Sequence, residues 1–121
     1  MVALALALSA ALAADVEVRD ITGRPVEIGG HAQVLVYWTM RDPSALARVA
    51  ELEARGAEVI LVSLDAAPEH AMLQPFLRAR GIDGIVVADP AGQLRGQFAP
   101  APGDTVAMLG NAADGPVIAA R

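Results

Sequence analysis

The side chains that could do chemistry in this sequence are carboxylates, hydroxyls and two imidazoles, because its 121 residues include no cysteine. Asp42 precedes Pro43 at the start of a predicted helix, where the helix dipole stabilises a carboxylate. The common role of an aspartate at this place is the N-cap, which stabilises a helix by about 1 kcal/mol. The missing thiol excludes every mechanism that needs a cysteine nucleophile of this chain.

The histidines and serines form no recognisable catalytic set. His31 follows two glycines in a predicted loop, and His70 falls in the first turn of a predicted helix. Exposed histidines without a catalytic role are common at both kinds of place. Ser44 and Ser63 lack a base and an orienting acid within a nucleophile elbow. The sequence also has no glycine-rich phosphate loop and no His/Cys cluster with metal-ligand spacing, so we expect no cofactor and no metal.

Size and charge indicate one globular domain. At 55% apolar residues, the chain can bury a substantial core despite its length. Its net charge of −5 is not offset by any basic run, and a nucleic-acid partner is therefore not expected.

Residues 1–13 read MVALALALSAALA and are uncharged, rich in Leu and Ala, and closed by a small-x-small pattern. This pattern is typical of a secretory signal peptide cleaved near Ala13 or Ala14, although no Lys or Arg precedes the apolar run. The alternatives are a retained apolar segment or a membrane anchor, but a bilayer span needs roughly 20 residues. We therefore expect an exported, periplasmic domain over residues 14–121.

Hydrophobic periodicity predicts short strands that alternate with helices. Val16 and Val18 alternate with charged residues and begin a half-exposed hairpin, and continuous apolar runs predict strands that are covered on both faces. The predicted strands span 16–18, 26–28, 34–37, 59–64 and 85–88, and the predicted helices span 42–55, 68–80 and 93–98. A last hairpin is predicted from strands 105–109 and 116–119.

The two longer helices have clear ends. Gly56 should end the first of them and Gly81 the second. Pro75 should kink or divide the second helix, because proline lacks a backbone donor and crowds the preceding turn. The inward side chains of that helix are expected to be Met72, Leu73, Phe76 and Leu77.

Four motifs in a fixed order point to a family. They are the entry hairpin DITGRPV at 20–26, Tyr37-Trp38 before a Pro-containing turn, the strand end VSLD at 62–65, and the turn DPAG at 89–92. With them, residues 15–121 resemble the exported thioredoxin-like proteins of the TlpA type. The resemblance implies an α/β fold with a central mixed sheet flanked by helices and an N-terminal β-hairpin. The C-terminal helix of that family has no counterpart in this sequence.

The sequence departs from the family at the active site. Asp42 and Ala45 stand where the family has its two cysteines, and a gap-free overlay puts Asp104 at the cis-proline position and Thr105 at the threonine after it. Pro102 takes the proline place only with a shift of two residues. A cis bond before a non-proline residue costs roughly 2.5–4 kcal/mol, so we expect this loop to be trans.

The resemblance therefore implies a redox-inactive domain, for which three functions stay open. The first is a non-catalytic module of the cell envelope that binds a protein or peptide in a groove lined by the family-matched residues Trp38, Asp42, Ala45, Asp104 and Thr105. The second is a carboxylate-dependent or metal-dependent enzyme, in which Asp42 and Asp104 share a proton or hold a cation with Asp65. The third is a degenerate homologue with only a structural role. Trp38 has its own alternative, as a core residue whose indole N–H finds one acceptor.

The last predicted hairpin raises a question of burial. It places apolar side chains on both faces of the sheet, at Val106, Met108, Val117 and Ile118, whereas the predicted helices cover one face. A large uncovered apolar face is rare on a soluble monomer. We therefore expect self-association, a partner, or residues 1–13 to cover it.

Overall fold

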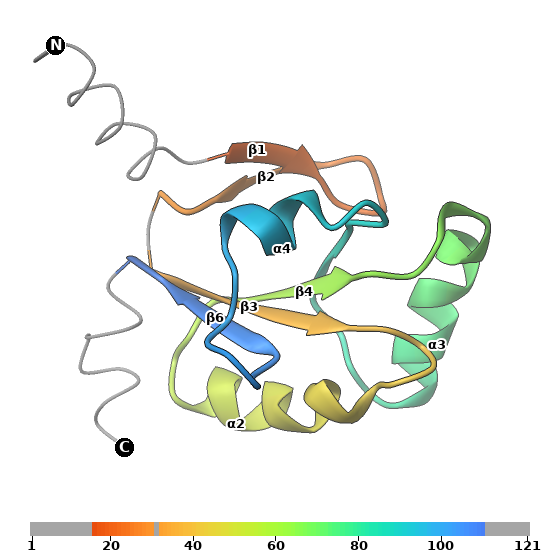
Figure 1. Ribbon diagram of the computed structural model, residues 1–121. Helices are drawn as coiled ribbons and strands as arrows, with labels where there is room; N and C mark the ends of the chain where they lie inside the picture. The colour runs from red at the N-terminus through yellow and green to blue at the C-terminus, as the bar shows by residue number, and fades with distance from the viewer. Residues whose placement is uncertain (1–15, 31, 111–121) are drawn as a thin grey trace, which may run out of the picture.

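The protein folds around a four-stranded mixed sheet with a separate two-stranded hairpin packed on it (Figure 1). The structure is a computed structural model that describes residues 16–30 and 32–110. Its strands are β1 (Val16–Arg19), β2 (Pro25–Ile28), β3 (Gln33–Trp38), β4 (Val59–Ser63), β5 (Ile85–Ala88) and β6 (Val106–Leu109). Its helices are the 3-10 helices η1 (Ser44–Arg48) and η2 (Ala67–Met72) and the α-helices α2 (Val49–Ala54), α3 (Leu73–Ala79) and α4 (Gln93–Gln97).

The sheet has the order β5-β4-β3-β6. β3 pairs with β4 in parallel, β4 with β5 in parallel, and β6 runs antiparallel to β3. Every residue of β3 and β4 is buried. These are the continuous apolar runs of the sequence, and their burial on both faces confirms the strands that the sequence predicts.

One face of the sheet, the helical face, packs against the two helix pairs. Val34, Val36 and Trp38 of β3 contact a cluster that includes Leu52 of α2 and Leu77 of α3. α2 ends at a turn in which Gly56 has a φ of +86°. A residue with a side chain is strained at such a φ, and the glycine predicted as the end of this helix is therefore required there.

The opposite face, the hairpin face, is covered by β1, β2 and α4 (Figure 1). Leu35 and Tyr37 of β3 pack there against Val26 and Ile28 of β2 and Leu94 of α4. The expectation of an uncovered sheet face is wrong for the described residues, because the apolar side of the half-exposed hairpin and Leu94 of α4 cover that face. The argument for self-association through that face is removed with it.

The closing strand supplies apolar side chains to both clusters. Val106 belongs to the helical face and Met108 packs against it, whereas Ala107 lies on the hairpin face. Among the described residues, the exposed large hydrophobic side chain is Met72, at 57%. Residues Val117 and Ile118 of the predicted last hairpin lie outside the described residues, as do residues 1–13 and His31.

Each of the two longer predicted helices is divided into a 3-10 turn and a shorter α-helix. The second divides between Met72 and Leu73, and Pro75 is the third residue of α3. The first N–H groups of a helix have no partner within it, so Pro75 fits there and the helix begins just before it. Met72 points outward instead of inward, because a 3-10 turn has three residues and places its side chains on other faces than an α-helix does.

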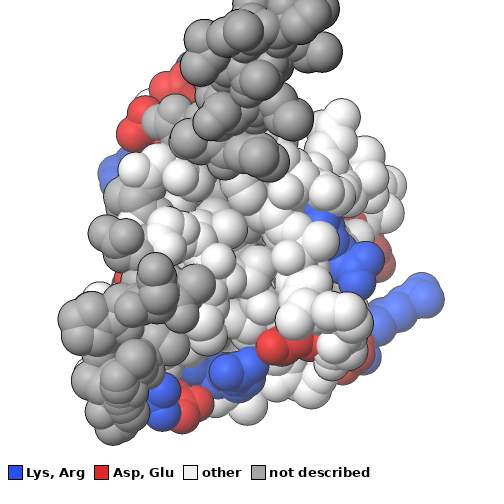
Figure 2. Space-filling model, turned by 60° about the vertical axis from the view of Figure 1, so that its left-hand side comes forward, with Lys and Arg blue, Asp and Glu red and all other residues white. Residues whose placement is uncertain are grey.

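The surface carries charges of both signs. In the view of Figure 2, Arg side chains lie beside acidic ones near the margins, and the middle of this face is mostly uncharged. No helix in the described part of the chain is long and apolar enough to cross a membrane.

Candidate functional site

The turn after β3 is the centre of the candidate site. It follows Trp38 and leads into η1, and its ends are tied by the Asp42 N–H, which donates to Thr39 Oγ1 at 3.0 Å. The Asp42 side chain accepts a hydrogen bond from Ser44 Oγ at 2.9 Å. Arg41 and Asp42 are exposed to solvent, so the turn presents both a cation and an anion at the surface.

A buried aspartate holds this turn from beneath. Asp65 is 6% exposed, and its two carboxylate oxygens accept from the Met40 N–H at 3.2 and 3.1 Å. Ser63 Oγ donates to the same carboxylate at 2.8 Å, and His70 Nε2 lies 2.9 Å from the Asp65 backbone oxygen. A buried carboxylate that accepts from two donors is satisfied, so Asp65 fixes the turn.

The loop before β6 is closed by its own aspartate. Asp104 Oδ1 accepts from the Thr105 N–H at 2.7 Å and from the Val106 N–H at 3.3 Å. The Thr105 carbonyl accepts from the Tyr37 N–H at 2.9 Å, which joins the loop to β3. All the peptide bonds of the described residues are trans, so neither Asp104 nor Pro102 supplies a cis bond.

The two aspartates of the predicted carboxylate pair each contact another side chain. Asp104 contacts Arg48 Nη1 at 3.4 Å, and Asp42 contacts Ser44. The described residues contain no group of three His, Cys, Asp or Glu side chains that could hold a metal ion. The structure thus gives no support to an enzyme built on Asp42, Asp104 and Asp65.

Asp42 is also not the N-cap of a helix. The 3-10 helix η1 starts at Ser44, with Pro43 in the capping position at φ −88° and ψ 14° and with no side-chain cap hydrogen bond. Proline directly after Asp42 has no N–H to offer, and the Asp42 carboxylate binds the Ser44 hydroxyl instead of a helix N–H. The predicted cap is wrong, because the helix starts at Ser44 with no hydrogen bond from one of its N–H groups to a capping side chain.

The five family-matched residues divide into an exposed and a buried set. Asp42, Asp104 and Thr105 are exposed. Trp38 is 2% exposed and Ala45 is 5% exposed, so both belong to the core beneath the turn. The core alternative for Trp38 is therefore the correct one, but its indole Nε1 has no hydrogen-bond partner among the described residues, in contrast to the expected acceptor.

Trp38 packs in an aromatic stack. Its ring lies 5.7 Å from that of Phe76, at an interplanar angle of 18°. The Arg80 guanidinium carbon lies over the Phe76 ring, 4.1 Å from the ring centroid. Phe76 and Arg80 were not predicted as part of the site, and only the tertiary packing of α3 brings them near it.

Comparison with known proteins decides the fold. The sequence matches no protein-family model and no curated protein sequence. Solved structures do match: a secreted Mycobacterium tuberculosis disulfide oxidoreductase homologous to E. coli DsbE has a TM-score of 0.55 and 16% identity, over 74% of this chain and 69% of that one. StoA from Bacillus subtilis has a TM-score of 0.55 and 16% identity, over 75% of each chain. The fold is thioredoxin-like.

A third structure has a higher sequence identity. A putative thiol:disulfide interchange protein DsbE from Chlorobium tepidum matches with a TM-score of 0.51 and 26% identity, over 71% of this chain and 66% of that one. The thioredoxin-like fold is thus shared with disulfide oxidoreductases, whereas this sequence has no cysteine. The resemblance predicted from the sequence is confirmed at the level of the fold.

Proposed function

We propose that the protein is a redox-inactive thioredoxin-like domain of the cell envelope that binds an extended segment of another protein. The observation that carries this proposal is the turn after β3, which buried Asp65 holds in place and which is exposed to solvent. Hydrogen bonds to Asp65 hold this turn in one conformation, but the chain has no thiol to place on it. Such a surface can bind a chain but cannot exchange disulfides with it.

The turn and the loop before β6 form one surface, which we call the turn–loop surface and define as residues 39–43 and 103–105. The Arg48–Asp104 ion pair links η1 to the loop. Both of its side chains are 42% exposed, so the pair contributes little to stability. Trp38 and Ala45 support this surface from the core and do not meet a partner.

A cavity beside Pro43 suits one side chain of a bound segment. It has a volume of about 440 Å³ and is lined by Leu46 and Ala47 on one side and by Arg80 and Ile82 on the other. Extended peptides are commonly held by backbone contacts with one or two side chains in pockets. An apolar side chain of a peptide that crosses the turn would find this cavity at Pro43.

The cell-envelope location rests on two observations. Residues 1–13 have the composition of a secretory signal peptide. One of the proteins that shares the fold is a secreted disulfide oxidoreductase. An exported domain without cysteines keeps its stability in an oxidising compartment without any disulfide of its own.

The proposal is tested by nuclear magnetic resonance on the ¹⁵N-labelled chain, titrated with unstructured peptides that each place one Leu, Val or Phe between polar residues. We expect the amide signals of residues 39–42 and 103–105 to shift. Ala47→Phe should weaken binding at least about tenfold by filling the cavity, which is a modest loss on the scale of interface residues. Ala54→Phe is the matched control, because Ala54 is also exposed on this helix pair but does not line the cavity.

Two results would contradict the proposal. The first is the absence of any saturable shift on the turn–loop surface with every peptide. The second is equal binding by the Ala47→Phe and Ala54→Phe variants, which would place the contact elsewhere. Either result would leave the chain as a structural homologue of the oxidoreductases.

A further inference from the structure

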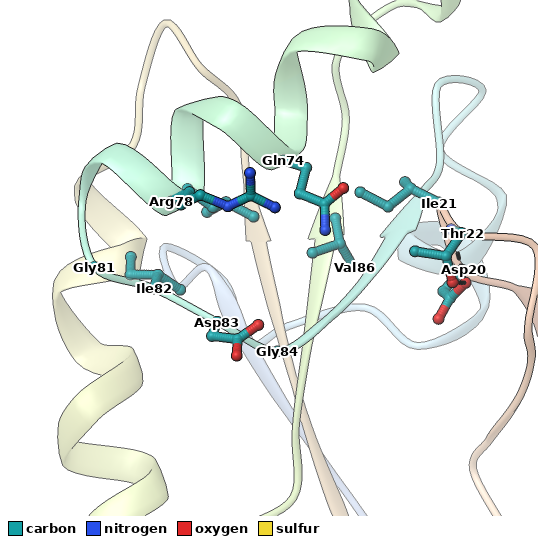
Figure 3. Close-up of a pocket in the computed structure, with 11 residues that line it drawn as sticks. Asp20, Ile21, Thr22, Gln74, Arg78, Gly81, Ile82, Asp83, Gly84 and Val86 are labelled. Carbon is teal, nitrogen blue, oxygen red and sulfur yellow. Dashed lines mark hydrogen bonds between the residues drawn. The ribbon is translucent and has the colours of Figure 1, made fainter.

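A second cavity lies at the outer edge of β5, away from the turn–loop surface. It has a volume of about 380 Å³ and is enclosed by α3, by the loop that follows α3, and by the hairpin turn at residues 20–22. Figure 3 shows Gln74 and Arg78 reaching from α3 on one side and Asp83 on the other, with Val86 between them. This volume is at the small end of the range for ligand sites, which is about 300–1,000 Å³.

The walls of this cavity are fastened to one another by backbone geometry. The Ile21 N–H donates to the Val86 carbonyl at 2.8 Å, which fixes the hairpin turn to the edge of β5. The chain leaves α3 through Gly81, whose φ is +72°, and Ile82 N–H returns to the Leu77 carbonyl at 3.0 Å. The cavity is therefore preformed, and a ligand does not have to order its walls.

The polar side chains around the cavity are uncommitted. Within the described part of the chain, neither Arg78 nor Asp83 has an ion-pair partner, and Gln74 makes no side-chain hydrogen bond. Asp20 in the same cavity is different, because its Oδ1 accepts from the Thr22 N–H at 2.8 Å and from Thr22 Oγ1 at 2.6 Å. Asp20 thus holds the hairpin turn, whereas Arg78 and Asp83 are left as one cation and one anion over an apolar base.

We propose that this cavity binds a small zwitterion with a short apolar side chain, namely a free amino acid or a dipeptide. The Arg78 guanidinium can hold the carboxylate of the ligand through two parallel hydrogen bonds. Asp83 accepts from its ammonium group, and Gln74 supplies one donor and one acceptor. Leu77 and Val86 form the apolar base against which the side chain packs.

The inference does not depend on the function proposed above. The loop at 81–83 lies between the two cavities and lines both of them. Arg78 lines only the β5-edge cavity, and Ala47 lines only the cavity beside Pro43. Variants at these two positions therefore test the two proposals separately.

The probe for the carboxylate is the dipeptide Ala-Leu, used with the full chain in isothermal titration calorimetry beside its C-terminal amide. We expect saturable binding of Ala-Leu and a loss of at least about tenfold on Arg78→Gln, since a hydrogen bond to a charged group is at stake. The C-terminal amide of Ala-Leu should bind the wild-type chain about as weakly as Ala-Leu binds the Arg78→Gln variant. The affinity for the amide should be the same in the wild type and in Arg78→Gln, because the amide has no carboxylate for Arg78 to hold. Arg95→Gln on α4 is the control of equal charge change and should bind Ala-Leu as the wild type does.

The ammonium is tested in the same way. Asp83→Asn should weaken Ala-Leu at least about tenfold but leave the weak binding of N-acetyl-Ala-Leu unchanged, and Glu69→Gln is its control. Absence of saturable binding of Ala-Leu up to about 10 mM overturns the inference, since a site that weak discriminates nothing. Equal binding by wild type and Arg78→Gln overturns it as well.

Discussion

The two faces of the sheet can be compared at two neighbouring residues of β3, Tyr37 and Trp38, which differ in the hydrogen-bond partners of their side chains. Tyr37 and Trp38 are adjacent on β3 and are each 2% exposed, but successive side chains of a strand point to opposite faces. Tyr37 enters the hairpin face and Trp38 the helical face. Both rings carry one hydrogen-bond donor, and among the described residues only the donor of Tyr37 has an acceptor.

On the hairpin face, the end of α4 accepts a hydrogen bond from the Tyr37 hydroxyl. Tyr37 Oη lies 2.7 Å from the carbonyl of Phe98, the residue that ends α4. It also lies 3.2 Å from the Leu94 carbonyl, which accepts from the Phe98 N–H within the helix. The last carbonyls of a helix have no partner within it, so the phenol and the helix end satisfy each other. Burial raises the pKa of Tyr37 far above its usual range, and the nearby Asp89 carboxylate adds to this.

On the helical face, the side of a helix meets the tryptophan. The side of α3 presents the Phe76 ring, which stacks on Trp38, and within the described part of the chain the indole N–H has no acceptor. The comparison teaches that two adjacent buried side chains of one strand depend for their hydrogen-bond partners on different elements, because each meets only what is packed on its own face of the sheet.

The sequence contains one tyrosine and one tryptophan. Tyrosinate absorbance therefore reports on Tyr37 in the hairpin face, and indole fluorescence reports on Trp38 in the helical face. Each face has its own spectroscopic signal in the unmodified chain.

The largest effect that separates the two faces is expected at alkaline pH. The pKa of Tyr37 is raised in the folded state, so its contribution to stability is fully present below the unfolded pKa of about 10. It is lost as the pH rises above that value, at a limiting rate of about 1.4 kcal/mol for each pH unit. We expect tyrosinate absorbance to appear only together with unfolding, measured by circular dichroism at the same pH.

Tyr37→Phe is the control for this transition. It should remove the steep loss of stability above pH 10 while costing about 1–2 kcal/mol at neutral pH, because the Phe98 carbonyl loses its donor. If tyrosinate forms near pH 10 in a chain that is still folded, Tyr37 is not closed in by α4 in solution.

A smaller effect is expected from Trp38→Phe. The variant loses packing against Phe76. It also removes a buried N–H that has no acceptor in residues 16–30 and 32–110, and leaving such a group unsatisfied costs about 1–3 kcal/mol. The two changes oppose each other, and the free energy of unfolding, measured in urea by circular dichroism, should stay within about 1 kcal/mol of the wild type. A loss above about 2 kcal/mol would mean that the indole does have an acceptor, as the sequence had led us to expect.

The strands and the course of the chain could be predicted, because they depend on apolar runs and turn residues that are local in the sequence. Gly56 and the run of β5 from Ile85 to Ala88 are examples. The outward position of Met72 could not be predicted, because the sequence does not show that Ala67–Met72 forms a 3-10 helix, which places its side chains on other faces than an α-helix does. The cover of the hairpin face was also missed, since the alternating pattern around Val16 and Val18 does not say what the apolar side of the hairpin packs against.

The candidate site was predictable in position but not in its contacts. The sequence predicts Asp42 at the start of a helix and Thr105 at the start of a strand. In the structure both lie just before those elements, and they are exposed, as is Asp104. The partners of Asp104 and Asp65 depend on tertiary distances, and Arg48 gave no signal at all. For the hydrogen bonds of Asp65 beneath the turn, the sequence offers one signal, the strand end Ser63-Leu64-Asp65. Ser and Asp side chains at such positions often form local hydrogen bonds, as Ser63 Oγ and Asp65 do here.

The smallest expected effect on the free energy of unfolding is that of removing the Asp42 carboxylate. Asp42 contacts an exposed hydroxyl and no helix N–H, so Asp42→Ala should change the free energy of unfolding by no more than about 0.5 kcal/mol. Asp104→Ala is the matched comparison, since it removes an acceptor of two backbone N–H groups and should cost about 1 kcal/mol. Both values are to be measured by urea denaturation, with Trp38 fluorescence as the signal of unfolding. An Asp42→Ala loss as large as that of Asp104→Ala would restore the N-cap that the sequence suggested, because a true cap contributes about 0.5–2 kcal/mol.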